Sequence, residues 1–199
     1  MKAVEPITLA DDRLRLEPLS MGHLDGLLNA AADGELWKLR FTSVPEPQAT
    51  AAYIEAALKH QAEGHRLPFA AIDVMTNHVV GCTSYHDIVP AIERLEIGWT
   101  WYAKSAQRTH VNTTAKYLLL CHAFDTLGAQ LVGWRTDNFN FASQRAIERL
   151  GARRDGVLRH HRLRRDGTVG DTVMYSLAAG EWPEVKAHLE WLLAMNRST

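Results

Sequence analysis

Few side chains of this 199-residue chain stand in patterns that carry chemistry by themselves. The sequence contains no G-x-S-x-G nucleophile elbow, no phosphate-binding P-loop and no H-E-x-x-H zinc motif. His160 and His161 are adjacent on a segment that is predicted to be a strand, so their side chains would point to opposite faces and could not easily share one metal ion. We interpret them as histidines with ordinary surface or core partners, and no metal is expected.

The carboxylates of Glu93 and Glu96 and the hydroxyl of Ser143 are the candidates for proton transfer. A carboxylate can take a proton from an ammonium group, directly or through water, and a hydroxyl can donate one to a good leaving group. Each also has a structural interpretation: either glutamate could be a solvated strand residue, and Ser143 could be a helix N-terminal hydroxyl. The choice depends on the elements that carry these residues.

The hydrophobic period changes several times along the chain and defines those elements. Residues 94–102, rich in Trp, Ile and Thr, are predicted to be the last of three consecutive strands joined by short loops. The full order is a strand at 13–19, helices after Ser20 and at 48–63, strands at 69–74, 79–85 and 94–102, a helix at 113–127, a strand at 131–136, a helix at 141–150, a hairpin of 157–164 and 172–177, and a last helix from Pro183. No linker or repeat interrupts this order, so we expect one mixed α/β domain over residues 1–199.

Composition places the chain among soluble globular proteins, with 46% hydrophobic and 23% charged residues. No apolar run approaches the ~20 residues of a membrane span, and the first residues lack the apolar core of a signal peptide. Cys82 and Cys121 stand in apolar surroundings and are predicted to be buried thiols. We therefore expect a cytoplasmic protein without a membrane partner. The net charge of −1 gives no global reason to expect nucleic acid.

The segment from Asn140 to Ala152, NFASQRAIERLGA, resembles the second-helix signature of the GNAT acetyltransferase superfamily. Its Asn, the Ser three positions later and the Leu-Gly pair are similar to the RimJ/RimL-type branch, and so is the C-terminal run over residues 155–176. The order of predicted elements is also that of the superfamily. The resemblance implies an α+β fold with a mixed, mostly antiparallel sheet flanked by helices, in which a splayed strand pair binds acyl-CoA. The implied activity is acetyl-CoA-dependent N-acetyl transfer.

The resemblance also implies where acetyl-CoA, the co-substrate, would bind. The strand over 95–102 would carry a β-bulge that frees backbone groups for the pantetheine arm, and a backbone N–H near Ile97 or Gly98 would polarise the thioester carbonyl. The loop 107–113 and the following helix N-terminus would hold the pyrophosphate. The residues implied for cofactor binding are Ile97, Gly98, Trp99, Gln107, Thr109, His110, Val111, Asn112, Thr113, Thr114, Asn140 and Ser143.

The phosphate loop departs from the superfamily pattern, in which small residues follow the Gln. His110 and Asn112 stand at those positions. Both residue types tolerate a positive φ, so the same backbone path remains possible, although their side chains would occupy space that glycine leaves to the phosphates. Thr113 and Thr114 could return some affinity as hydroxyl donors.

For catalysis, the resemblance makes Glu96 the first candidate for the base that deprotonates an acceptor amine, and Glu93 the second. The tyrosine with which many members protonate the leaving thiolate is replaced by Ile147, and Ser143 is the substitute proposed in the RimJ/RimL branch. A thiol with a pKa near ~8.5 needs only a weak donor. Asn140 could contact the pantetheine amides, cap its helix, or do both.

Trp37, Arg40 and Phe41 lie in the region that lines the acceptor site in this superfamily, and together with Glu93 they are our candidate acceptor set; Trp37 and Phe41 could equally be core residues. Six arginines between residues 153 and 165 could form a solvated hairpin face, neutralise CoA phosphate or an acidic acceptor, or bind RNA. The predicted acceptor is a primary amine, such as a protein N-terminal α-amine. A small-molecule amine (an antibiotic or a polyamine) and a non-catalytic acyl-CoA-binding module are the alternatives. A homodimer is left open.

Overall fold

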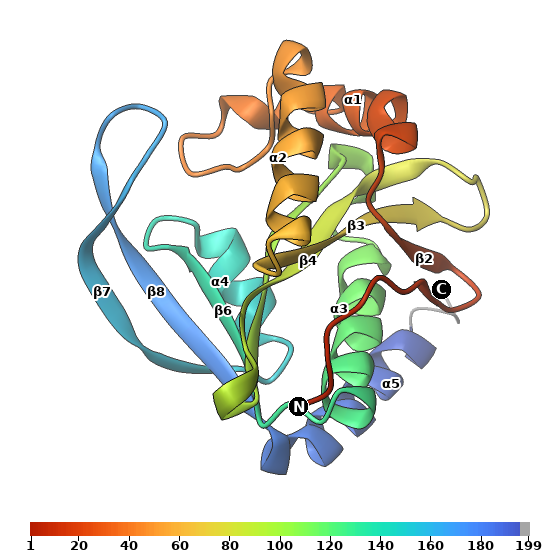
Figure 1. Ribbon diagram of the computed structural model, residues 1–199, viewed down its shortest axis with the longest axis vertical. Coiled ribbons are helices and arrows are strands. Elements are labelled where there is room, and N and C mark those ends of the chain that lie inside the picture. The colour runs from red at the N-terminus through yellow and green to blue at the C-terminus, as the bar shows by residue number, and fades with distance from the viewer. Residues whose placement is uncertain (196–199) are drawn as a thin grey trace.

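Eight strands form one sheet in the computed structural model, which describes residues 1–195 (Figure 1). The strands lie in the order β1-β2-β3-β4-β5-β6-β8-β7, and all neighbours are antiparallel except β5 and β6. Their bounds are β1 Leu9–Ala10, β2 Leu14–Pro18, β3 Arg66–Asp73, β4 Val79–Val89, β5 Arg94–Tyr102, β6 Leu131–Asp137, β7 Arg153–Leu163 and β8 Val169–Ala178. The mixed, mostly antiparallel sheet that the sequence predicts is confirmed.

Within residues 1–195, five α-helices cover this sheet: α1 Leu24–Ala32, α2 Thr50–Ala62, α3 Val111–Cys121, α4 Phe141–Glu148 and α5 Trp182–Met195. Strand alternation assigns α2 and α3 to opposite faces. Tyr53 of α2 contacts Arg66 and Cys82, whereas Tyr85, an odd number of residues from Cys82 on β4, donates its hydroxyl to the carbonyl oxygen of Leu119 on α3. Helix α5 packs beside α3 (Figure 1).

The third helix differs most from its predicted bounds. It begins at Val111, two residues earlier than predicted, and its last turn, His122–Thr126, widens to π-helical hydrogen bonding. Gly128 follows with a φ of 74°, a left-handed conformation that favours glycine. Because of the early start, Asn112 and Thr113 lie in the first turn of α3 and not in a loop.

Strands β5 and β6 pair over only three residues, and this short pairing decides where the sheet opens. It runs from Arg94↔Leu131 to Glu96↔Gly133, after which the two parallel strands have no further paired residues. Each strand keeps its antiparallel partner on the far side, β4 for β5 and β8 for β6. The sheet is therefore continuous at one end of this strand pair and open at the other.

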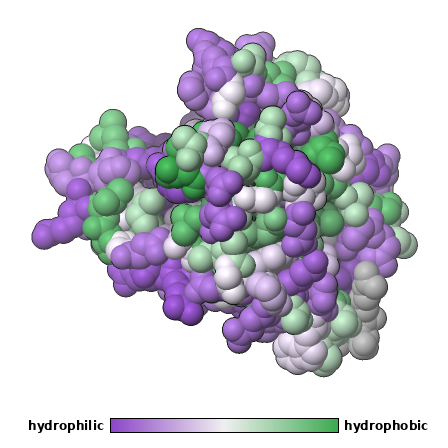
Figure 2. Space-filling view, turned by 60° about the horizontal axis from the view of Figure 1, so that its bottom comes forward, coloured by the Kyte–Doolittle hydropathy of each residue, from purple (hydrophilic) through white to green (hydrophobic). Residues whose placement is uncertain are grey.

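The β7–β8 hairpin projects from the body of the molecule (Figure 1) and is irregular where the two histidines lie. The register shifts between Leu158 and Arg162, and His160 has a φ of 53°. Both histidines lie in β7 as predicted, but the ladder is irregular there: the N–H of His160 donates to Asp171 Oδ1 at 2.8 Å. Apolar and charged side chains are mixed on the exposed hairpin (Figure 2).

The two cysteines were predicted to be buried thiols. Cys82 is buried and Cys121 half-buried, and both are free thiols. Burial raises the pKa of both thiols, that of Cys82 to about 11. None of the described helices is both long and apolar enough to cross a membrane. Among residues 1–195, no three His, Cys, Asp or Glu side chains gather closely enough to hold a metal ion.

Candidate active site

A β-bulge lies in β5 just beyond the point where the strand leaves β6. Ser84 on β4 opposes Gly98, but Cys82 opposes Trp101, so a single residue of β4 faces both Trp99 and Thr100. Trp99 takes a φ of 52°, which is uncommon for a bulky residue. The bulge bends β5 and leaves two residues outside the regular ladder at the open end of the strand pair.

On the α2 face, a buried arginine holds the bulge. Arg66, on β3, is only 4% exposed, and its guanidinium carbon lies 4.5 Å from the centre of the Trp99 ring. Its Nε donates to Ser84 Oγ at 2.8 Å and its Nη2 to the Tyr53 hydroxyl at 3.2 Å. Among the ion pairs of residues 1–195 there is none that joins Arg66 to a carboxylate. The site therefore contains a buried positive charge with only neutral partners.

Glu96 lies where β5 and β6 part, and it is fully buried. Both of its oxygens accept hydrogen bonds from Arg135 of β6, at 2.6 and 2.7 Å, and Oε1 also contacts Arg94. Gly133 makes room for this carboxylate, because a Cβ there would lie 2.9 Å from Glu96 Cγ. Asp87 accepts from the same two guanidinium groups, so the cluster contains two carboxylates and two arginines. The residue predicted to be the base is thus the centre of a charge-balanced network.

His86 lies beside this network, and the sequence motifs did not indicate it. Its Nε2 is 3.8 Å from Glu96 Oε2, and a Cβ on Gly98 would come within 2.3 Å of the same nitrogen. Burial lowers the pKa of His86 to about 4, with smaller contributions from the charges of Arg135 and Arg162, so the ring is neutral near pH 7. Strand β4 runs to Val89, four residues further than predicted, which makes His86 the cross-strand neighbour of Glu96. Extending the antiparallel pairing of β4 and β5 backwards from the short connection between them would have placed His86 opposite Glu96.

Comparison with known proteins decides the family. Residues 13–153 match the acetyltransferase (GNAT) domain family. The chain belongs to the GNAT acetyltransferases. Among solved structures it is similar to an acetyltransferase of T. thermophilus (38% identity, 96% of this chain and 98% of that chain covered, TM-score 0.83) and to a GCN5-related N-acetyltransferase of Brucella melitensis (31% identity, 96% and 87% covered, TM-score 0.83).

A more distant structure shares the fold. Mycobacterium smegmatis RimJ in complex with CoA-disulfide is 21% identical, covers 99% of this chain and 98% of its own, and has a TM-score of 0.81. No match is found among curated proteins. The GNAT family uses acetyl-CoA, and the residues here fit that co-substrate, because the sheet opens beside an irregular strand whose backbone is out of register with β4.

The phosphate loop of this GNAT chain takes a path different from the one expected. The positive φ falls on Arg108, at 63°, whereas His110 has a helical φ of −64°. Thr109 stabilises the turn by donating to the carbonyl of Ala106 at 2.7 Å and accepting from the N–H of Val111 at 3.3 Å. The positive φ that the sequence left possible at His110 and Asn112 does not occur at either residue, because α3 begins before Asn112.

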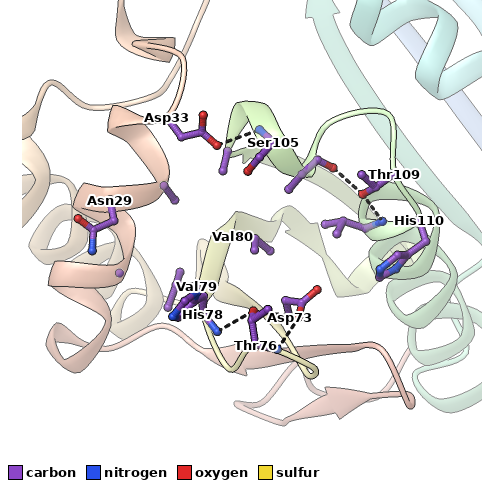
Figure 3. Close-up of a pocket in the computed structure, with 15 residues that line it drawn as sticks. Asn29, Asp33, Asp73, Thr76, His78, Val79, Val80, Ser105, Thr109 and His110 are labelled. Carbon is purple, nitrogen blue, oxygen red and sulfur yellow. Dashed lines mark hydrogen bonds between the residues drawn. The ribbon is translucent and has the colours of Figure 1, made fainter.

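The side chains implied for phosphate binding are divided between solvent and core. Gln107 is exposed and donates to the carbonyl of Tyr102 at 3.0 Å. Asn112 is half-buried, while Thr113 and Thr114 are 4% and 0% exposed, so neither hydroxyl faces solvent. Exposed Thr109, half-buried His110 and buried Val111 line a cavity of about 570 Å³ between α1, the start of β4 and the loop (Figure 3). These three residues therefore face α1 across the cavity.

Helix α4 begins next to the opening with a side-chain cap. Asn140 Oδ1 accepts from the N–H of Ser143 at 3.1 Å, which is the helix N-cap that was one of its two interpretations. Ser143 is half-buried, and Ile147, in the position where many relatives have tyrosine, is 6% exposed. Phe139 and Phe141 are 53% and 55% exposed at the same helix end. This exposed aromatic pair was not predicted, although two phenylalanines beside an N-cap were visible in the sequence.

The candidate acceptor residues lie on a segment that is tied to the hairpin. Arg40 pairs with Asp166 at 3.0 Å and donates to Thr168 at 2.8 Å. Arg165 reaches the other way and donates to the carbonyls of Trp37 and Val44. Trp37 and Phe41 are half-buried. We call these reciprocal contacts between residues 37–44 and 165–168 the clasp. Arg40 and Arg165 therefore have structural partners that the sequence could not indicate.

Glu93 lies apart from this group. It is the last residue of the connection between β4 and β5, with a φ of 52°, and its half-exposed carboxylate pairs with the amino group of Met1 at 2.9 Å. It is at the closed end of the β5–β6 pair, where the carbonyl of Glu93 accepts from Gln130. The structure thus brings Glu96 to the opening and leaves Glu93 away from it.

Proposed function

We propose that this GNAT acetyltransferase moves the acetyl group of acetyl-CoA to a primary amine that binds over His86, on the α2 face of the sheet. The observation that carries the proposal is the opening between β5 and β6 beside the bulge at Trp99. Acetyl-CoA supplies the activated acetyl thioester. The chain supplies backbone groups along Ile97–Trp99, which we expect to orient the thioester as an added strand would.

His86 is better suited to orienting the amine than to deprotonating it. With a pKa of about 4, its imidazole would take a proton from an ammonium group of pKa ~8 at a cost of about 5 kcal/mol. As a neutral ring it can accept a hydrogen bond from the free amine and direct the amine lone pair. The alkaline rise in rate should then follow the ionisation of the acceptor itself.

Glu96 takes a supporting role in this proposal. Its carboxylate touches Arg135, Arg94 and the edge of His86, and it has no solvent exposure. We therefore no longer assign Glu96 the role of the base. We propose instead that it holds the His86 ring in place and fixes the point where β5 and β6 separate. Ser143 stays our candidate for donating a proton to the leaving sulfur, because its hydroxyl makes no hydrogen bond within residues 1–195.

The charges around His86 favour one class of acceptor. Arg66 and Arg162 are close enough for their charges to lower the pKa of His86, and neither pairs with a carboxylate in the described part of the chain. The carboxylates of Asp87 and Glu96 are already balanced by Arg94 and Arg135. A polyamine would meet uncompensated positive charge, whereas an α-amine next to acidic groups would be attracted. We therefore propose an N-terminal α-amine of an acidic protein or peptide as the acceptor.

An amine panel tests this function. Release of free CoA thiol from acetyl-CoA is followed with peptides of acidic and of basic N-terminal sequence, spermidine and an aminoglycoside. We expect turnover to be highest with the acidic peptides. Preference for spermidine or the aminoglycoside would favour the small-molecule alternative. Acetyl-CoA binding without turnover on any amine would instead favour a binding module.

A further inference from the structure

A buried lysine lies directly behind the bulge, on the face opposite Arg66. Lys116, in the middle of α3, is 4% exposed. Its Nζ donates to Thr100 Oγ1 at 2.8 Å and to Thr83 Oγ1 at 3.2 Å. The two threonine hydroxyls are 2.8 Å apart. Within residues 1–195, no carboxylate forms an ion pair with Lys116.

We call Lys116, Thr83 and Thr100 the triad. One assignment of donors and acceptors satisfies all of its hydrogen bonds. Thr100 Oγ1 also lies 3.4 Å from the carbonyl oxygen of Gly98, which can only accept. Thr100 must then donate to Gly98, Thr83 must donate to Thr100, and Lys116 donates to both hydroxyls. The chain of donors runs from the lysine, through Thr100, to the peptide group that joins Gly98 to Trp99.

That peptide group needs to be held. Trp99 has its φ of 52° there, a conformation that costs of order 1 kcal/mol or more and persists only when the surroundings fix it. Arg66 packs on the Trp99 ring from the α2 face, and the Lys116 triad reaches the backbone from the α3 face. The bulge is therefore fixed from both sides of the sheet, each time by a cation without a carboxylate partner among the described residues.

We propose that Lys116 is a positioning residue for acyl transfer, which acts through Thr100 to fix and polarise the Gly98–Trp99 peptide group at the open end of β5. This inference rests on the proposed function only for its catalytic consequence. A hydrogen bond accepted by the Gly98 carbonyl strengthens the Trp99 N–H of the same peptide as a donor, because hydrogen bonds in a chain polarise one another. Lys116 would thus tune a backbone donor without touching the substrate.

The ionisation of Lys116 gives this role a distinctive readout. Burial lowers the pKa of Lys116 to about 7, against a small opposing effect of Cys82 from β4. Cys82 has its own pKa raised to about 11 by burial and is neutral over the same range. Thr83 and Thr100 do not titrate, so the charge of the triad changes only when Lys116 ionises. As an ammonium, Lys116 is the stronger donor to Thr100.

The test compares variants of the full chain in steady-state kinetics with the best amine of the panel, between pH 5.5 and 9. Lys116→Met removes the donor and keeps the side-chain length, Thr100→Val removes the hydroxyl, and Leu119→Met changes an equally buried position of α3 outside the triad. We expect kcat to fall about tenfold in Lys116→Met and Thr100→Val, the effect of one ordinary hydrogen bond, with KM for acetyl-CoA changed less than about threefold. We expect the wild-type kcat profile to have an inflection near pH 7, because the pKa of Lys116 is about 7. This inflection should vanish in Lys116→Met, and Leu119→Met should behave as the wild type.

Amide hydrogen exchange of Trp99 and Thr100 provides a second measurement that does not depend on turnover. We expect faster exchange at these amides in Thr100→Val, and in Lys116→Met if that variant folds, but not in Leu119→Met. Unchanged kcat, pH profile and exchange in folded triad variants would overturn the inference. A wild type inactive on every amine would instead overturn the proposed function, and the exchange result would still decide whether Lys116 fixes the bulge.

Discussion

Glu96 on β5 and Lys116 on α3, which contacts Thr100 of β5, are two buried ionisable side chains that are held in opposite ways. Glu96, where β5 still pairs with β6, is surrounded by two arginines and shares them with Asp87. Lys116, behind the bulge four residues further on, has only the hydroxyls of Thr83 and Thr100 as polar partners among the described residues. The closed end of the strand pair is therefore held by a balanced ion network, whereas beside its open end a buried amine has no carboxylate partner within residues 1–195, next to the backbone that we propose to orient the acyl group.

Removing the carboxylate of Glu96 should have the largest effect on stability. Glu96→Gln leaves Arg94 and Arg135 with Asp87 alone, and breaking a buried ion pair from one side costs about 3 kcal/mol or more. We expect the free energy of unfolding in urea to fall by about that amount. Glu93→Gln, which breaks a half-exposed pair just before β5, should cost less than about 1 kcal/mol. Equal losses in the two variants would contradict the contrast between the network and an ordinary surface pair.

The second prediction concerns the uncompensated charge. Because the pKa of Lys116 is lowered to about 7 in the fold, between pH 7 and about 10 the unfolded chain binds a proton that the folded chain lacks. Stability contributed by this residue therefore rises with pH across that window, by at most about 1.4 kcal/mol per pH unit, and is constant below it. Lys116→Met should flatten this part of the profile and be more stable than the wild type near pH 6.

Denaturation in urea at pH 6, 8 and 9.5 checks this sign. A gap between Lys116→Met and the wild type that is widest at pH 6 and narrows by pH 9.5 is expected. A gap that widens with pH would contradict it. Thr100→Val, which keeps the buried amine, should retain the wild-type slope and serves as the control.

The contrast also shows what the sequence could and could not predict. The period of the apolar residues predicted β5 over 94–102 as observed, and placed Glu96 on it, because both are local properties. The role of Glu96 could not be predicted, since Arg135 is 39 residues away and pairs with it only once β6 lies alongside. Lys116 was not predicted for the same reason: its threonine partners come from two strands, and only their register brings them together.

Two other features differ from the sequence predictions: the loop before α3 and the hairpin arginines. The sequence left a positive φ possible at His110 and Asn112, but the residue with a positive φ is Arg108, and α3 begins at Val111, two residues earlier than predicted. The clasp of Arg40 and Arg165 joins segments more than 120 residues apart. Side-chain bonds of this length leave no periodic signal, so a solvated face was an equally good interpretation of the hairpin arginines.

His86 lies beside the Glu96 network on the α2 face, with its Nε2 3.8 Å from Glu96 Oε2. We expect His86→Ala to lower kcat/KM for the amine about tenfold or more, with His86→Asn, which restores an acceptor oxygen, partly rescuing it. Because the pKa of His86 is about 4, the rate should show no inflection near pH 6.5 that belongs to this residue. Its alkaline rise should shift between two acceptors whose amine pKa values differ.

Rates measured from pH 5.5 to 9.5 with an α-amine peptide and with a more basic primary amine check this assignment. A common inflection near pH 6.5 with both acceptors, lost in His86→Asn, would contradict it and make His86 a base. His60→Asn, at an exposed position on α2, is the matched control and should leave the profile unchanged.

The smallest effect is expected at the clasp, where the arginines are exposed. Arg165→Ala removes two hydrogen bonds to the carbonyls of Trp37 and Val44, so the segment over residues 37–44 should hold the acceptor less well. Because exposed contacts add little to stability, the melting temperature should stay within about 2 °C. KM for the amine should rise about threefold while KM for acetyl-CoA is unchanged, if residues 37–44 bind the acceptor as the sequence predicts. Arg149→Ala, an exposed arginine at the C-terminal end of α4, is the control. An equal rise of both KM values in Arg165→Ala would contradict this prediction. It would mean that the clasp affects acetyl-CoA binding as much as acceptor binding.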